Sequence, residues 1–91
     1  MKINKVGVVG CGTMGSGITQ VCAQAGYQVT VSEITADLLH KGLAQIGASL
    51  SKAVEKQRMT SQEKEAALAR IKGTTNFKDF SDCDLIIEAA I

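Results

Sequence analysis

The sequence predicts an α/β fold in which a parallel sheet carries helices on both faces. Apolar runs suited to buried strands alternate with stretches of helical periodicity, in the order strand, helix, strand, two helices, strand, helical turn, strand. Such alternation is typical of parallel sheets joined by right-handed crossovers. Two further observations refine the fold: a glycine-rich turn follows the first strand, and an acidic residue follows the second.

The glycine-rich turn joins the strand expected over residues 3–9 to the helix expected over residues 13–25. Gly10, Gly12 and Gly15 have the spacing G-x-G-x-x-G. In this pattern the first glycine permits a tight turn, the second lets the backbone approach a pyrophosphate, and the third lets helix and strand pack closely. Free N–H groups at the helix N-terminus would face the phosphates. The turn predicts a Rossmann-type dinucleotide site; the alternative is a structural turn that binds no ligand.

Glu33 follows the second strand, which is expected over residues 27–32. An acidic residue about 20 positions beyond the glycines accepts hydrogen bonds from the adenosine ribose in such sites. Its charge would repel the 2′-phosphate of NADP, so the pattern favours NAD. The alternative is that Glu33 is an ordinary solvated residue at a strand end.

An αα-hairpin is expected after the second strand. Its first helix begins at the N-cap candidate Thr35 and extends to about residue 57. The apolar stripe of this helix comprises Leu39, Leu43, Ile46, Leu50 and Val54. The polar stripe comprises Lys41, Gln45, Ser49, Lys52 and Lys56. One face is therefore expected to pack on the sheet and the other to face solvent or a ligand.

The second helix of the hairpin has a capping signal. Thr60 and Glu63 form a T-x-x-E capping box, so this helix is expected to begin near Ser61. Gly73 is expected to end it, and a short third strand is expected over residues 74–77.

The remaining elements are a helical turn over residues 78–81 and a strand over residues 85–89. In the strand order 3-2-1-4 the first and fourth strands are neighbours, so Gly10 and residues 88–90 would border one crevice. That crevice is where a cofactor is expected. The first helix is expected to pack on the sheet through Met14, Ile18, Val21, Cys22 and Ala25.

Composition limits the class of protein. The chain has 91 residues, of which 45% are hydrophobic, and its net charge of +1 gives no reason to expect nucleic acid as a partner. Three cysteines without C-x-x-C spacing indicate reduced thiols in a cytoplasmic type of compartment. No apolar run approaches the roughly 20 residues of a membrane-spanning helix. Residues 84–91 form an apolar run without a polar tail, so we expect the N-terminal portion of a longer chain.

The residues resemble a known family, the NAD-binding domain of the 3-hydroxyacyl-CoA dehydrogenases. The resemblance is carried by the stretches Val8–Ile18, Ala25–Tyr27 and Asp84–Ala90, and it extends over the whole chain. Within the family the chain looks most similar to the bacterial 3-hydroxybutyryl-CoA dehydrogenases. The resemblance implies an oxidoreductase of fatty acid and butanoate metabolism in the cytoplasm. Such an enzyme interconverts 3-hydroxyacyl-CoA and 3-oxoacyl-CoA by hydride transfer with NAD.

The resemblance also implies roles for individual residues. Glu33 would bind the adenosine ribose, although the family usually has aspartate there, and Ala89 and Ala90 would lie close to the nicotinamide. Ser49 and Lys56 would contact coenzyme A; being seven residues apart, they share one helix face. The pyrophosphate of NAD would be held by Gly10, Cys11, Gly12, Thr13, Met14 and Gly15.

The catalytic residues implied by the family are absent from this chain. A histidine paired with a glutamate takes the proton of the substrate hydroxyl in the family, and both are expected beyond Ile91. They would lie in a helical C-terminal domain, through which a homodimer would form. His40 matches no catalytic position, and no metal site is expected. Two alternatives are a related hydroxy-acid dehydrogenase acting on a substrate without coenzyme A, and a non-catalytic module that senses NAD(H).

Overall fold

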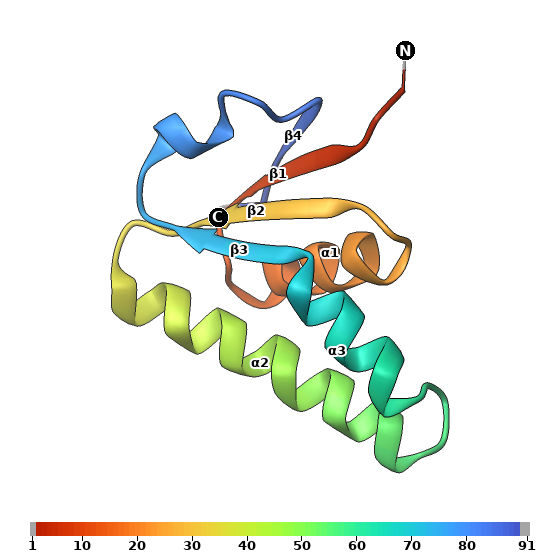
Figure 1. Ribbon diagram of the computed structural model, residues 1–91. Coiled ribbons are helices and arrows are strands. Elements are labelled where there is room, and N and C mark those ends of the chain that lie inside the picture. Colours follow the sequence, from red (N-terminus) through yellow and green to blue (C-terminus); the bar gives the residue numbers. More distant parts are fainter. Residues whose placement is uncertain (1, 90–91) are drawn as a thin grey trace.

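The computed structural model describes residues 2–89, which form a four-stranded parallel sheet with helices packed against it (Figure 1). The strands are β1 (Lys5–Val9), β2 (Gln28–Ser32), β3 (Ile71–Thr74) and β4 (Leu85–Glu88). The helices are α1 (Thr13–Gln24), α2 (Ala36–Glu55), α3 (Ser61–Ala69) and the 3₁₀ helix η1 (Phe77–Phe80). The strand order is β3-β2-β1-β4, and each neighbouring pair is parallel. The predicted fold class and strand order are confirmed.

The two faces of the sheet are covered differently. Figure 1 shows α1, α2 and α3 together on one face and η1 on the other. Helix α1 contacts both members of the predicted hairpin, α2 and α3. Because all four strands are parallel, their carboxyl ends lie at one edge of the sheet, and the turns that enter α1 and α2 lie at that same edge.

The core lies between the sheet and the three α-helices. Alternate side chains of β1 and β2 are at most 3% exposed, namely Val6, Val8, Val29 and Val31. Ile46 and Leu50 of α2 join this cluster at 1% and 0% exposure. Each such side chain contributes about 1.5–3 kcal/mol by leaving water. The apolar stripe predicted for α2 therefore faces the core.

Local side-chain caps fix where the helices of the hairpin begin. The hydroxyl of Thr35 accepts a hydrogen bond from the Leu38 N–H at 3.2 Å. At α3, the Thr60 hydroxyl accepts from the Glu63 N–H at 3.1 Å, and the Glu63 carboxylate accepts from the Thr60 N–H at 2.8 Å. Both predicted helix starts are confirmed.

The face by which α1 packs on the sheet differs from the prediction. Met14 and Val21 were expected to be buried, but they are 55% and 65% exposed. The buried residues of α1 are instead the small ones, Gly15, Ser16, Thr19 and Ala23. Helix α1 lies so close to the sheet that only small side chains fit between them. The Thr19 hydroxyl has no hydrogen-bond partner within residues 2–89, which indicates that its size, not its polarity, suits the position.

The prediction for Gly73 and the third strand was also wrong. Helix α3 ends at Ala69, and β3 already begins at Ile71, so Gly73 lies inside a strand. The reason is tertiary packing. A Cβ at Gly73 would lie 3.0 Å from the Leu39 side chain and 3.1 Å from that of Leu43, so the glycine lets α2 pack tightly on β3.

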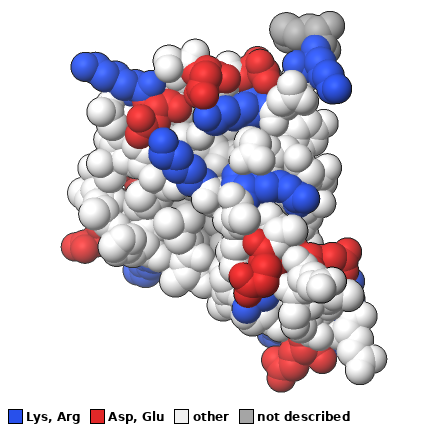
Figure 2. All heavy atoms as spheres, viewed as in Figure 1, with Lys and Arg blue, Asp and Glu red and all other residues white. Residues whose placement is uncertain are grey.

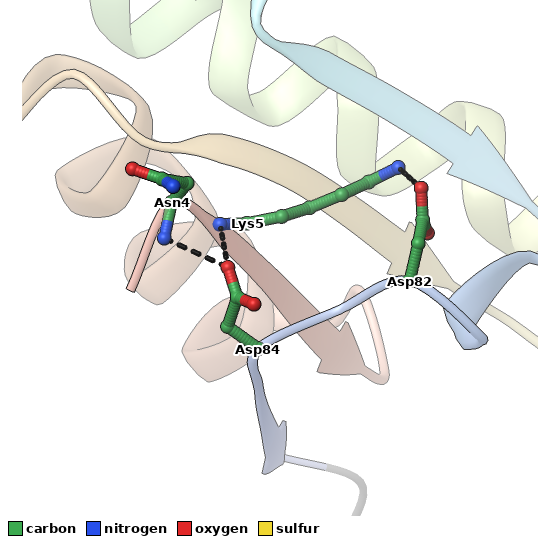
Figure 3. A network of polar contacts seen from close by, with 4 residues as sticks. All are labelled: Asn4, Lys5, Asp82 and Asp84. Carbon is green, nitrogen blue, oxygen red and sulfur yellow. Dashed lines mark hydrogen bonds and ion pairs between the residues drawn. The ribbon is translucent and has the colours of Figure 1, made fainter. Parts of the chain in front are cut away.

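A polar network joins the starts of β1 and β4, at the edge of the sheet opposite the strand carboxyl ends (Figure 3). The Asp84 carboxylate accepts hydrogen bonds from the N–H groups of Asn4 at 2.8 Å and Lys5 at 2.9 Å. The Lys5 ammonium pairs with Asp82 at 2.7 Å. The hydrogen bonds from the two N–H groups hold the pKa of Asp84 below its ordinary value of 3.8.

On the face of the molecule seen in Figure 2, acidic and basic side chains are interspersed.

The lowered pKa of Asp84 predicts an acid-dependent loss of stability. A carboxyl whose pKa is lower in the folded state stabilises fully above its unfolded value and loses this effect as the pH falls through the folded pKa. The urea unfolding midpoint should therefore decline below about pH 4, and Asp84→Asn should decline less steeply. Glu65→Gln, at an exposed acid of α3 with no side-chain hydrogen bond in the described chain, should keep the original pH dependence. Identical profiles for Asp84→Asn and the unmodified protein would contradict the prediction.

Candidate cofactor-binding site

The turn between β1 and α1 has the local geometry that the glycine spacing predicts. Gly10 adopts φ of 101°, a left-handed conformation that favours glycine. A Cβ at Gly15 would lie 1.8 Å from the carbonyl oxygen of Gly10, so the helix can approach the strand end only without a side chain there. A Cβ at Gly12 would have no neighbour within 4 Å, and Gly12 is exposed. The backbone is therefore open to a ligand at Gly12.

Glu33 lies directly against this turn. Its carboxylate accepts a hydrogen bond from the Cys11 N–H at 2.9 Å and another from the Ile34 N–H at 2.9 Å. The Glu33 N–H donates to the Thr74 carbonyl at 3.1 Å, which extends the pairing of β2 with β3 past the end of β2. The acidic residue and the glycine turn, 22 positions apart at Cys11 and Glu33, thus form one structure.

Beside Glu33 is a hollow of about 220 Å³ with apolar walls. Ile34 and Phe77, which line it, are 82% and 67% exposed. Large apolar side chains held in water beside a carboxylate suit a flat, apolar ligand group such as adenine. Its remaining lining residues are Val9, Gly10, Ser32 and Thr75.

Sequence reasoning missed Ile34, Thr75 and Phe77. The misplaced third strand hid the last two, because residues 74–77 were assigned to it. With β3 ending at Thr74, Thr75 and Phe77 follow a strand carboxyl end, where ligand-binding residues gather in parallel sheets. That position was the signal that could have identified them.

A second hollow, of about 420 Å³, connects the start of α1 with the end of β4. Six of the predicted cofactor residues line it: Gly10, Gly12, Thr13, Met14, Glu33 and Ala89. The N–H of Ala89 donates to the Val9 carbonyl at 2.8 Å, which places the end of β4 beside the turn. The crevice predicted between the first and fourth strands is therefore present. Ala90 lies outside the described residues.

Two predicted cofactor residues lie beneath this surface. Gly15 is buried against the turn, and the Cys11 side chain is 2% exposed. A Cβ at Gly42 of α2 would lie 2.3 Å from the Cys11 sulfur, so α2 packs directly on the turn at this point. Burial raises the pKa of the Cys11 thiol above its ordinary value of 9.0, and the hydrogen bond with Ser16 opposes this only in part. The thiol is therefore protonated at neutral pH, and only the N–H of Cys11 faces Glu33.

The predicted coenzyme A residues lie apart from these hollows. Ser49 is exposed on α2, and Lys56 is the exposed residue just after its end. Along α2, the last residue that lines a hollow beside the turn is Gln45, so Ser49 and Lys56 lie beyond the hollows. Among residues 2–89 no cluster of His, Cys, Asp and Glu could hold a metal ion, and none of the helices described is long and apolar enough to cross a membrane.

Comparison with known proteins assigns the family. Residues 5–91 match the sequence family of the 3-hydroxyacyl-CoA dehydrogenase NAD-binding domain. The chain belongs to this family. It is 44% identical to a 3-hydroxybutyryl-CoA dehydrogenase of Bradyrhizobium diazoefficiens over 98% of the chain and 30% of that protein. The crystal structure of (S)-3-hydroxybutyryl-CoA dehydrogenase from Ralstonia eutropha is 43% identical, with a TM-score of 0.96, over 99% of this chain and 32% of that one. That of Mycobacterium tuberculosis FadB2 is 44% identical, with a TM-score of 0.98, over 100% of this chain and 32% of that one.

Family membership confirms the resemblance noted in the sequence, and with it NAD as the cofactor. The residues present fit this cofactor, since an open backbone at Gly12, a fixed carboxylate at Glu33 and an apolar hollow at Phe77 follow one another along the edge of the sheet. The chain spans about a third of the length of these relatives.

The close approach at Gly15 predicts a difference between two glycines of the same helix. Gly15→Ala should destabilise the fold by about 1–3 kcal/mol, the usual range for overpacking, because its Cβ meets the Gly10 carbonyl. Gly17→Ala is the matched control, since its Cβ would meet nothing within 4 Å. That change should stabilise the helix by about 0.5–1 kcal/mol through helix propensity. Urea unfolding measures both, and equal midpoints for the two variants would rule out the close approach.

Proposed function

We propose that the full-length protein is an NAD-dependent 3-hydroxyacyl-CoA dehydrogenase that oxidises 3-hydroxybutyryl-CoA or a similar short-chain substrate to the 3-oxoacyl-CoA. The observation that carries the proposal is the continuous site along the sheet edge, from the open backbone at Gly12 to Glu33 and Phe77. It occurs in a chain of the corresponding NAD-binding family. The similarity to 3-hydroxybutyryl-CoA dehydrogenases supports the choice of substrate.

In this proposal the chain binds and orients the cofactor. N–H groups at the start of α1 face the pyrophosphate, where the partial positive charge of the helix end favours an anion. The Glu33 carboxylate, held in place by the Cys11 N–H, accepts hydrogen bonds from the adenosine ribose hydroxyls. Ile34 and Phe77 pack on the adenine. When bound, NAD supplies the hydride acceptor.

The nicotinamide half is proposed to lie at the other end of the second hollow, near Ala89. Proton removal from the substrate hydroxyl requires a base, and His40 does not supply one. It is exposed on α2 and lines none of the hollows beside the turn. We assign the catalytic histidine and glutamate to a helical C-terminal domain of the full-length protein.

Coenzyme A is proposed to bind along the polar stripe of α2. Ser49 is exposed on the face of α2 that carries this stripe, and Lys56, exposed just after the end of the helix, offers a cation to the phosphates of the carrier. We further propose that the full-length protein is a cytoplasmic homodimer, assembled through the C-terminal domain, as the family resemblance implies.

The apolar hollow gives a test of cofactor placement. In the full-length protein, Phe77→Ala should raise the NADH dissociation constant about tenfold, or about 1.4 kcal/mol, because it removes the aromatic wall beside Glu33. Tyr27→Ala is the control, since this half-exposed aromatic residue precedes β2 at the opposite edge of the sheet. Isothermal titration calorimetry should show unchanged NADH affinity for the control. Equal affinities for the two variants would exclude Phe77 from the site.

Steady-state kinetics test the substrate. Lys56→Ala in the full-length protein should raise KM for 3-hydroxybutyryl-CoA about tenfold, as for loss of a charge-assisted hydrogen bond, with KM for NAD unchanged. Lys72→Ala, at an exposed lysine of β3, is the control. An unchanged KM for the acyl-CoA would remove Lys56 from the site. Turnover of free hydroxy acids but not acyl-CoA would favour a hydroxy-acid dehydrogenase, and NADH binding without any turnover would favour a sensing module.

A further inference from the structure

The Glu33 carboxylate occupies a place where two backbone N–H groups can bind an anion. The N–H groups of Cys11 and Ile34 converge on it, one on each oxygen, both at 2.9 Å. These donors belong to the turn and to the chain after β2, so they would remain if the side chain were shortened. Glu33 thus fills with its own charge a place that two N–H donors prepare for any anion.

A third hollow opens beside this position, between the turn and α2, with a volume of about 250 Å³. Glu33, Gly12 and Thr13 form one wall, and Lys41 and Gln45 of α2 form the other. The ammonium of Lys41 makes no hydrogen bond or ion pair within the described part of the chain, where Lys5 and Asp82 form the one ion pair. The hollow is therefore lined by the Lys41 ammonium, which has no partner in the described chain, and by the Glu33 carboxylate.

The wall that carries Lys41 is held against the turn by close contacts. A Cβ at Gly42 would lie 2.1 Å from the Cys11 carbonyl oxygen, so the two backbones touch. The Ser16 hydroxyl donates to the Cys11 carbonyl at 3.0 Å and lies 3.4 Å from the Gly42 carbonyl. Lys41, the residue before Gly42, is thus fixed at the start of its side chain and can move only at its flexible end.

We infer that Lys41 is a specificity-determining residue, and that it makes this hollow a latent site for the 2′-phosphate of NADP. The inference rests on the proposed function, in which Glu33 binds the adenosine ribose, because the 2′-hydroxyl then lies at Glu33. In the native chain the carboxylate repels the phosphate. Without it, the N–H groups of Cys11 and Ile34 face the vacated place, and the Lys41 side chain borders the same hollow; all three groups favour an anion.

The test compares NADH and NADPH dissociation constants in the full-length protein by calorimetry. The native protein should prefer NADH, and Glu33→Ser should lower the NADPH dissociation constant at least about tenfold, as for removal of one close repulsive charge. Adding Lys41→Ala should reverse that gain by about tenfold, as for loss of a charge-assisted hydrogen bond, with NADH affinity little changed. Adding Lys52→Ala, on the same polar stripe but outside the hollow, should preserve the gain.

Lys41→Ala in the native background gives a second measurement if Glu33→Ser proves unstable, and it should weaken NADPH binding several-fold while NADH binding is retained. The inference is overturned if Lys41→Ala affects NADPH no more than Lys52→Ala does, or if Glu33→Ser gains no NADPH affinity. In both cases native NADH binding would leave the proposed function intact. A native protein that binds neither nucleotide would overturn the proposed function and this inference with it.

Discussion

The contact between Gly15 and the carbonyl of Gly10 is the constraint on which the rest of this structure depends. At this contact α1 approaches the end of β1 so closely that a single methyl group could not be accommodated. The N-terminus of α1 therefore lies at the edge of the sheet, where its N–H groups face the crevice. The same approach limits the side chains that α1 can bury, and the four residues buried beneath it, Gly15, Ser16, Thr19 and Ala23, are all small.

A second close approach joins the turn to α2. Gly42 meets the carbonyl and sulfur of Cys11, and Glu33 holds the Cys11 N–H on the other side. The turn is thus fixed from the sheet, from α1 and from α2 at once. Substitution at Cys11 or Gly42 would therefore shift the backbone of the turn, although both residues are buried. The site is accordingly a property of how three elements pack, and the residues that face solvent are only part of it.

The sequence predicted those features that local interactions determine. Thr35 and the Thr60–Glu63 capping box gave the correct helix starts, because a cap depends on residues within one turn of helix. The glycine spacing and Glu33 located the crevice for a similar reason. The glycines are required by the local geometry of the turn, and Glu33 directly follows the end of a strand. Residue roles in cofactor binding and at Ser49 and Lys56 stay predictions.

The errors have a common physical cause, which is that hydrophobicity did not determine burial where elements approach very closely. Met14 and Val21 are apolar and exposed, whereas Thr19 is polar and completely buried. Gly73 would ordinarily end a helix, but here it relieves contact between β3 and the leucines of α2. In both cases the size of the side chain outweighed its polarity or its helix propensity. The effect of size depends on the surface against which the residue packs, and the local sequence does not contain that surface. The exposed aromatic wall at Phe77 was hidden by the same misplaced strand.

The choice of glutamate at position 33 follows from this geometry. The carboxylate must reach the Cys11 N–H across the end of β2 and must also accept a hydrogen bond from the N–H of Ile34. Glutamate has one methylene more than aspartate, which extends this reach. With both oxygens already bound, the carboxylate is held in one orientation before any ligand arrives, so less side-chain entropy is lost on binding. Its unused lone pairs remain available to ribose hydroxyls. The two N–H donors that hold the acid in place would remain if the acid were absent, so the proposed preference for NAD rests on the Glu33 side chain and not on the backbone around it.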